Sequence, residues 1–322
     1  MSQVIVVGSF NVDHVWRCAE LPAVGATIAG QYATGPGGKG FNQAVAAARA
    51  GAHTAFVCSL GDDPGGTLAR HLASAEGIGL YAEASDQPTG TAGIYVDARG
   101  RNSIVIGAGA NGSLSAAVLV ADPGLLAGAR VLLAQLESPV ESIEAALAQA
   151  RAVGLITMLN PAPANATTHT SLLGQVDVLT PNETEFAALL ARHVGERVDP
   201  DSVAALSGAE LHSLCRKLLP QGSVVVTLGS VGVFVSHAEE QLRGDAAAYY
   251  RLAAESVTAS DTTGAGDAFN GALAASLAGA GPDAAFIGHV RFANRYAALS
   301  TERPGAALSM PALAEVQARF PD

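Results

Sequence analysis

Short apolar runs alternate with helix-forming segments along most of this chain, and that alternation restricts the fold more than any other feature. Buried strands are expected at residues 3–9, 54–60, 130–135, 155–159, 176–180, 223–228 and 231–236. Helices are expected at 41–50, 66–75, 140–153, 183–192, 207–219, 264–278, 283–300 and 310–320, the last with Ser309 as its N-cap. Such alternation indicates an α/β fold with a mostly parallel central sheet and helices on both of its faces.

Two β-rich stretches, at about 13–35 and 89–107, interrupt this alternation. In the second, the runs 95–97 and 103–106 flank a polar turn, which is typical of a hairpin. We expect both stretches to pair into a small β-sheet that forms a lid over a site, within one domain that spans residues 1–322. The polar segment 193–206 is expected to be a surface insertion.

Composition and charge narrow the class of partner. The chain is 49% hydrophobic and 15% charged, as globular proteins are, and its net charge of −11 argues against a nucleic-acid partner. Its apolar runs fall short of the ~18 residues of a membrane span. The three cysteines are scattered, as expected for buried thiols in a reducing cytoplasm.

The most informative motif is the segment 261–271, in which a carboxylate, two hydroxyls and a Gly-Ala-Gly turn lead into an apolar helix. Gly264 and Gly266 allow the backbone to approach a ligand closely, and the N–H groups of the first helical turn can hold an anion. Asp267 places a base beside that phosphate cradle, which suggests phosphoryl transfer to a hydroxyl. The alternative is a glycine turn with an aspartate that only compensates the helix dipole.

A second glycine-rich segment, 35–40, formally matches the dinucleotide fingerprint G-x-G-x-x-G. A dinucleotide site is rejected because that fingerprint should follow the first strand directly, whereas a long irregular segment intervenes here. A Walker loop is also rejected, because Lys39 precedes glycine rather than Ser or Thr. The better interpretation is close approach of the backbone to a polyol, with Lys39 as a cation and Asn42 on the first helical turn.

Polar side chains also follow several expected strands. Asn11 and Asp13 come after the first strand and Glu137 after another, where carboxylates suit sugar hydroxyls, although such residues are often turn residues only. Asn182 and Glu185 open a helix, either as its cap or as groups that organise hydrated Mg²⁺ and phosphate. The glycine-rich strand exit at 227–232 is weak support for a nucleotide site.

Taken together, these segments resemble the PfkB family of carbohydrate and nucleoside kinases, and most of them match its ribokinase branch. The resemblance runs from about Val4 to about Pro311 and is carried by the segments 8–14, 37–43, 109–111, 135–139, 160–164, 180–185, 227–230 and 261–271. It implies a ribokinase-like fold and ATP-dependent phosphorylation of D-ribose at O5. Alternatives are a kinase for fructose, deoxyribose or adenosine, or a non-catalytic sugar-binding regulatory protein.

The resemblance also implies individual roles. Asp267 would be the base, and the N–H groups of Gly264, Ala265, Gly266 and Asp267 the anion hole. The sugar site would comprise Asn11, Asp13, Gly38, Lys39, Asn42, Glu137 and Asp267. The ATP site would comprise Asn182, Thr227, Gly229, Gly232, Gly266 and Asn294, with Glu185 on the Mg²⁺ side. An activating K⁺ would lie at Asp261, Thr263, Ser300, Arg303, Gly305 and Ser309.

Two further expectations come from the resemblance. Lids of this family often pair, so a homodimer is expected. Phe41 stands where the ribokinase branch commonly has a small residue, beside the glycine turn of the sugar site, which bears on the choice of sugar.

Overall fold

A nine-stranded sheet forms the centre of the structure, a computed structural model that describes residues 3–115, 117–281 and 284–321. Its strand order is β13-β12-β11-β10-β9-β8-β1-β4-β5. The bounds are β1 Val4–Val7, β4 Thr54–Gly61, β5 Gly79–Ser85, β8 Val131–Ala134, β9 Ile156–Leu159, β10 Val178–Leu179, β11 Ser223–Thr227, β12 Val233–His237 and β13 Tyr249–Leu252. All neighbouring strands pair in parallel except β11 with β12 and β12 with β13.

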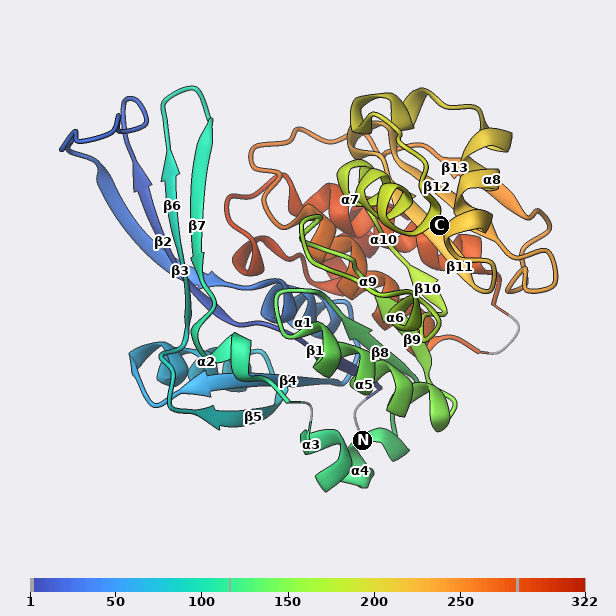
Figure 1. Cartoon of the computed structure of the whole chain (residues 1–322), viewed down its shortest axis with the longest axis horizontal. Helices are drawn as coiled ribbons and strands as arrows, with labels where there is room; N and C mark the ends of the chain where they lie inside the picture. Colours follow the sequence, from blue (N-terminus) through green and yellow to red (C-terminus); the bar gives the residue numbers. More distant parts are fainter. Residues whose placement is uncertain (1–2, 116, 282–283, 322) are drawn as a thin grey trace.

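Helices cover both faces of this sheet (Figure 1). One face carries α1 (Lys39–Arg49), α2 (Pro64–Ala75), α9 (Ala265–Gly279), α10 (Phe286–Ser300) and α11 (Leu313–Arg319). The other carries α3 (Ala117–Ala121), α4 (Pro123–Ala127), α5 (Val140–Ala152), α6 (Thr170–Leu173), α7 (Glu183–Leu189) and α8 (Gly208–Leu218). In β1, Val4 and Val6 join one core and Ile5 and Val7 the other, as expected of a strand buried on both faces. The predicted fold class is confirmed.

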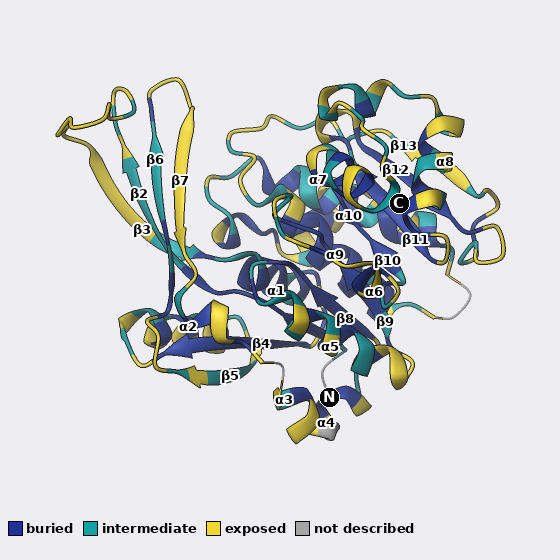
Figure 2. Ribbon diagram, viewed as in Figure 1, coloured by how far each residue is buried: buried dark blue, intermediate teal, exposed yellow. Residues whose placement is uncertain are grey.

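A separate four-stranded sheet, which we call the small sheet, has the order β3-β2-β6-β7. It consists of β2 (Asn11–Arg17), β3 (Gln31–Gly37), β6 (Gly90–Val96) and β7 (Asn102–Gly107), and the predicted hairpin is the antiparallel pair β6–β7. It stands away from the main sheet and is attached where β1 leads into β2 (Figure 1). Much of it is exposed, including all of β7 (Figure 2).

Several sequence-based expectations need correction. Strands β5 and β13 were not expected; both are edge strands of the main sheet with mixed burial, so they lack a continuous apolar run. Ser309 is not the N-cap of the last helix, because Ala312 takes that place. Ser309 lies instead in a short 3₁₀ turn (Ala307–Ser309), where its Oγ donates to Ala306 O.

Two other segments differ in detail. The expected start of a helix at residue 283 lies outside the described residues, and α10 begins at Phe286. The 193–206 segment is not only a surface insertion: its 3₁₀ helix Pro200–Ala205 places Val203 in the core on the α7 and α8 face. Among the described helices, none has the length and apolar character required to span a bilayer.

Candidate active site

A cavity lies where parallel strands of the main sheet end, at the N-terminus of α9. Residues that follow β9 and β10, and the last residue of β11, line it together with residues of α1, α7 and α9. The lining consists of Lys39, Asn160, Ala162, Thr180, Asn182, Glu185, Thr227, Thr262, Gly264, Ala265, Gly266, Asp267 and Asn270. Because strand ends at a sheet edge are the usual ligand site of α/β folds, this cavity is the candidate active site.

The N-terminus of α9 supplies an anion cradle. Gly264 is the N-cap with φ of 76°, and a Cβ there would lie 2.9 Å from Ala306 Cα, so both conformation and packing require glycine. Ala268 N–H donates the first helical bond, to Gly264 O at 2.8 Å. The preceding N–H groups, of Gly266 and Asp267, belong to the helical turn that has no acceptor within the helix. They can therefore bind a phosphoryl group.

Asp267 is buried at the floor of this cradle, and both of its oxygens accept amide hydrogen bonds. Asn42 Nδ2 donates to Oδ2 and Gln43 Nε2 donates to Oδ1, each at 2.9 Å. Burial raises the pKa of Asp267 above its ordinary value, while the charge of Lys39 and the two amide bonds oppose that rise. The result is a desolvated carboxylate that can accept a proton from an alcohol.

Of the expected sugar residues, Lys39 and Asp267 line the cavity, and Asn42, Asp13 and Glu137 interact with Asp267 from outside that lining. Glu137 Oε2 accepts from Ser9 Oγ at 2.6 Å and from the Lys39 N–H at 3.0 Å. Burial, with the charges of Glu137 and Asp267, raises the pKa of Asp13 to about 6. Burial by itself would lower the pKa of the Lys39 ammonium, but the negative charges of the surrounding carboxylates outweigh it, so the pKa lies above its usual value. Several carboxylates beside one ammonium favour a ligand with many hydroxyl donors.

Two more residues of this set have clear structural roles. Asn11 Oδ1 accepts from Asn111 Nδ2 at 2.8 Å, which fixes the orientation of the Asn11 amide. Gly38 has φ of 88°, and a Cβ there would lie 2.8 Å from Phe10 Cα, so the glycine turn needs this residue. Phe41 does not face the sugar site. It is buried against Phe10 and Phe56, with ring centroids 5.1 Å and 6.0 Å away, so it bears on the core rather than on the sugar.

The structure separates the expected ATP residues into two groups. Asn182, Thr227 and Gly266 line the cavity, as does Glu185 on the expected Mg²⁺ side, and Asn182 and Glu185 are joined in a capping box. Burial raises the pKa of Glu185. Gly229, Gly232 and Asn294 lie outside the lining that the described residues form. Gly232 has φ of 109° and a Cβ there would lie 2.0 Å from Leu252 O, while Asn294 Nδ2 donates to Ala253 O at 2.7 Å.

The residues expected around K⁺ come from two segments, one just before α9 (Asp261 and Thr263) and one that runs from the end of α10 to the 3₁₀ turn (Ser300, Arg303, Gly305 and Ser309). Asp261 joins them, since its Oδ1 accepts from the Thr263 N–H at 3.0 Å and its Oδ2 from the Gly305 N–H at 2.9 Å. Ser300 Oγ and Ser309 Oγ donate to main-chain oxygens. Within the described residues, no cluster of three or more His, Cys, Asp or Glu side chains could hold a metal.

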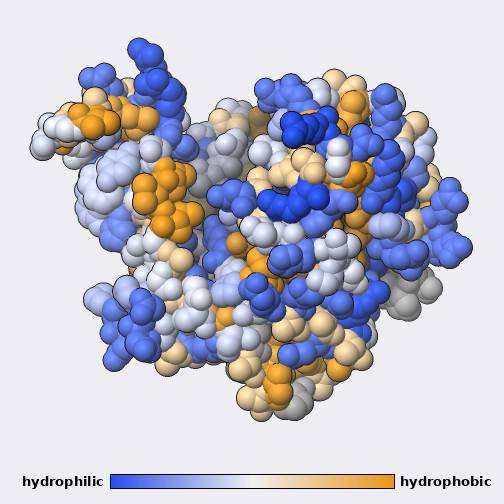
Figure 3. Space-filling model, viewed as in Figure 1, coloured by the Kyte–Doolittle hydropathy of each residue, from blue (hydrophilic) through white to orange (hydrophobic). Residues whose placement is uncertain are grey.

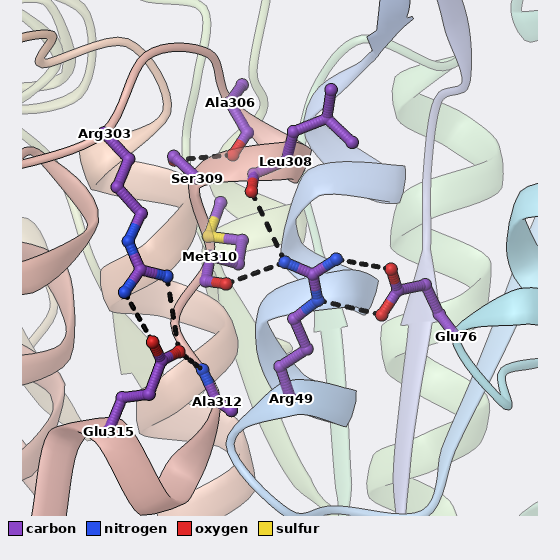
Figure 4. Close-up of polar contacts among 9 residues, drawn as sticks. All are labelled: Arg49, Glu76, Arg303, Ala306, Leu308, Ser309, Met310, Ala312 and Glu315. Carbon is purple, nitrogen blue, oxygen red and sulfur yellow. Dashed lines mark hydrogen bonds and ion pairs between the residues drawn. The ribbon is translucent and has the colours of Figure 1, made fainter.

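Two arginine–glutamate pairs hold the loop that contains Arg303 and Ser309 in place (Figure 4). Arg303 pairs with Glu315 at 2.5 Å, so its guanidinium is not directed at a cation. Arg49 pairs with Glu76 at 2.5 Å and also donates to Met310 O at 2.7 Å. The loop is thereby fixed to α1 and α2, on the side of Gly264 where Ala306 packs.

Sequence reasoning missed several polar residues of the cavity. Asn160, Thr180 and Asn270 line it, and Asn270 Nδ2 donates to Gly266 O at 2.8 Å in the cradle. Gln43 touches Asp267 directly. Asn160 directly follows an expected strand and Thr180 ends another, and these positions could have marked them. Gln43 and Asn270 stand inside motifs in which other residues were given the roles.

Comparisons with known proteins show which family the chain belongs to. The model of the pfkB family of carbohydrate kinases matches residues 1–313. A ribokinase of Haemophilus influenzae is 36% identical over 95% of this chain and 94% of its own. A deoxyribokinase of Salmonella typhi is 32% identical over 84% of both chains.

Solved structures show the same likeness. The ribokinase of Thermotoga maritima superposes with a TM-score of 0.84, 32% identity and 99% coverage of both chains. The Arabidopsis thaliana ribokinase in complex with ribose and ATP gives a TM-score of 0.82, 28% identity and 98% coverage of both chains.

Proposed function

This chain belongs to the pfkB family of carbohydrate kinases, and from that premise we propose that it transfers the γ-phosphoryl group of ATP to O5 of D-ribose. The products are D-ribose 5-phosphate and ADP. Relatives named ribokinase that match nearly the whole chain, and a solved relative that holds ribose and ATP, support this choice of substrates.

The reaction needs positioning and charge stabilisation more than covalent chemistry. As O5 of the sugar forms its bond to the γ-phosphorus, Asp267 accepts the hydroxyl proton and the bond to the β,γ-bridging oxygen breaks. The first-turn N–H groups of α9 bind the oxygens of the phosphoryl group in flight. Lys39, which lines the same cavity, adds positive charge beside Asp267.

One observation carries the proposal: the buried Asp267 carboxylate lies in the first turn of α9, within the cradle that Gly264 and Gly266 open. General-base help is worth about 10²–10⁴-fold. We expect Asp267→Asn to lose at least that much turnover while its melting temperature stays close to that of the wild type. A variant with near-normal ADP release would remove Asp267 from the role of base.

The acceptor is the least constrained part of the proposal, because a deoxyribokinase is among the relatives. Asn11, Asp13 and Glu137 offer polar groups to several hydroxyls, and a hydrogen-bonding site can reject an analogue that lacks one hydroxyl by about 10⁴-fold or more. Coupled ADP detection with ribose, deoxyribose, fructose and adenosine tests this. Ribose should give the highest kcat/KM, and a higher value for another acceptor would replace ribose by that acceptor.

A non-catalytic sugar-binding protein on the same fold is the remaining alternative. The intact Asp267 and its glycines argue against it, since binding alone does not require a desolvated base in an anion cradle. Sugar binding by calorimetry without ADP release from any acceptor would favour this alternative.

We also propose that ATP enters with Mg²⁺. Glu185 is a buried carboxylate in the cavity lining, and a hydrated Mg²⁺ needs few protein ligands, so this residue fits a place beside the metal's waters. When bound, Mg²⁺ would neutralise charge on the phosphates. Asn182, Thr227, Gly229, Gly232, Gly266 and Asn294 remain our predicted ATP contacts.

A monovalent cation site is proposed at the two loops joined by Asp261. An alkali cation prefers oxygen ligands, and this site offers the Asp261 carboxylate, with Thr263, Ser300, Gly305 and Ser309 nearby in the chain segments it connects. Arg303 could contribute only its main chain, because its guanidinium pairs with Glu315. We expect K⁺ to activate more than Na⁺; equal rates in the two salts would remove this site.

We propose that the small sheet is a lid over the sugar and that it pairs with the same sheet of a second copy. Figure 3 shows an apolar patch on this sheet, and Ile104, Val105 and Ile106 of β7 are each at least half exposed. Exposed apolar edge strands are normally covered. Light scattering should give a dimer, and Val105→Lys should give a monomer. A wild-type monomer at micromolar concentration would exclude the pairing.

A cytoplasmic location remains a prediction from the cysteines. Cys58 and Cys215 are buried free thiols, which suits a reducing compartment.

A further inference from the structure

Gln43, on α1, lies between the base and the edge of the main sheet. Its Nε2 donates to Asp267 Oδ1 at 2.9 Å and to Asn160 Oδ1 at 3.1 Å, and its Oε1 accepts from Gln135 Nε2 at 2.6 Å. Building on the proposed kinase function, we propose that Gln43, held by Gln135 and Asn160, is a positioning residue that fixes the Asp267 carboxylate for proton transfer.

The orientation of each amide in this chain is determined by its neighbours. Asn160 Nδ2 donates to Thr180 O at 3.0 Å, and a main-chain oxygen can only accept, so Asn160 must present its oxygen to Gln43. An ionised Asp267 also only accepts. Gln43 therefore directs its NH₂ group at two acceptors, and Gln135 must donate to the Gln43 oxygen.

This arrangement leaves one polar atom unsatisfied. Within the described part of the chain, the buried Gln135 Oε1 has no hydrogen-bond donor. An unpaired buried acceptor is costly, and apolar side chains of the same shape would avoid that penalty. Gln43 and Gln135 are both fully buried, so packing alone does not account for two amides at these positions. Their common effect is to hold one oxygen of the base.

Close packing of α1 against α9 brings Gln43 within reach. A Cβ at Gly271 would lie 2.5 Å from both Ala46 Cβ and Gln43 O, so the absence of a side chain at Gly271 sets the distance between the helices. Asp267 lies one helical turn before Gly271 on α9. Any side chain at 271 would move the base away from the Gln43 amide.

The hydrogen bond from Gln43 can be separated from the charges around the base. Lys39 on α1, Glu137 after β8, Glu185 on α7 and Asp13 on β2 all act electrostatically on or with Asp267. Gln43 carries no charge, and Gln43→Met keeps its length. The substitution therefore removes the donor to Oδ1 and leaves the four charges in place.

The test compares Gln43→Met with Thr157→Val. Thr157 is a fully buried residue of β9 whose Oγ1 bonds Gln175 O and Asp177, away from the cavity lining. For Gln43→Met we expect kcat to fall about 10²-fold, as for a base displaced by ~1 Å, with the sugar KM within about threefold. The acid limb of kcat/KM should move up by about one pH unit, because the carboxylate loses a donor. Thr157→Val should change neither.

A second measurement does not depend on the acceptor or on turnover. ¹³C NMR titration of the Asp267 carboxyl, assigned through Asp267→Asn, should show a pKa about one unit higher in Gln43→Met than in the wild type. Gln43→Glu, which keeps the shape but replaces the donor, should raise it further. An unchanged carboxyl pKa, or a kcat within threefold of the wild type, would overturn the role of Gln43. Absence of wild-type ADP release with every acceptor would instead refute the proposed function and leave the NMR result to decide on Gln43.

Discussion

Gly266→Ala should stabilise the protein and at the same time impair it as a kinase. Gly266 lies within α9 and lines the cavity, and a Cβ there would meet no heavy atom of the described residues within 4 Å. Alanine is favoured over glycine inside a helix by about 1 kcal/mol. The new methyl group therefore meets no steric opposition, and the free energy of unfolding should rise by up to about that amount.

The effect on catalysis follows from the same open space. The methyl group would project from the cradle where the phosphoryl group must bind against the first-turn N–H groups. Displacement of a reacting group by ~1 Å can lower the rate about 10²-fold, so kcat/KM should fall by that order. Gly266→Val, with its larger side chain, should fall further. Here a gain in stability and a loss of activity have one cause.

Differential scanning fluorimetry and coupled ADP release measure the two effects. The matched control is Gly279→Ala at the far end of α9, where a Cβ would also meet no heavy atom of the described residues within 4 Å. It should share the gain in stability and keep full activity. Gly271→Ala provides the opposite case, since its Cβ would lie 2.5 Å from Ala46 Cβ and overpacking costs about 1–3 kcal/mol. Near-normal activity of Gly266→Ala, or a large drop in its melting temperature, would refute the assignment of this space to the phosphoryl group.

Four further predictions concern pH and the loop of Figure 4. The pKa of Asp13 is raised to about 6, so the sugar KM should rise as pH falls through that value, and Asp13→Asn should have a high KM without this pH dependence. Because the folded state favours the protonated form of Asp13, its charge destabilises the unliganded protein above pH 6, and Asp13→Asn should raise the melting temperature more at pH 8 than at pH 5. Burial lowers the pKa of His237, so the folded protein favours the neutral imidazole, and this contribution to stability is fully present above the unfolded pKa of about 6.5. The melting temperature should therefore fall as pH drops below about 6.5, and it should fall less in His237→Gln. Parallel curves of melting temperature against pH for the two proteins would contradict this. Arg49→Met removes the hydrogen bonds to Met310 O and Glu76, so the free energy of unfolding should drop by about 1–3 kcal/mol. Half-maximal activation should then need a higher K⁺ concentration. An unchanged K⁺ titration would show that these Arg49 contacts do not support the cation site.

The central strands could be predicted from the sequence because each is a short run buried on both faces. Residues 4–7 are all apolar and all buried, which leaves little ambiguity. The edge strands β5 and β13 contain only exposed and half-buried positions, so they lack the continuous apolar run that marks the central strands. Ser309 was chosen as a cap from local chemistry, but Pro311 disfavours helical backbone in the residue before it, and the helix begins later.

The residues of the candidate site likewise differ in how far the sequence could predict them. The glycines and Asp267 were predictable because cradle and base are neighbours in one helical turn. Gln43, Gln135 and Asn160 were not, because each is a single amide and the contacts among them and Asp267 span 92 to 224 residues of sequence. Phe41 shows the converse: it is next to the glycine turn in the sequence, but helical geometry turns its ring into the core.

The small sheet carries Asn11 and Asp13 on β2, whereas Asp267 and its amide partners sit on helices packed against the main sheet. A sugar bound as we propose would thus contact the small sheet and these helices at the same time. Without the sugar, the two parts lack the contacts that it would make to both. We expect such a design to spare ATP from idle hydrolysis, since the acceptor itself assembles the machinery that consumes the nucleotide.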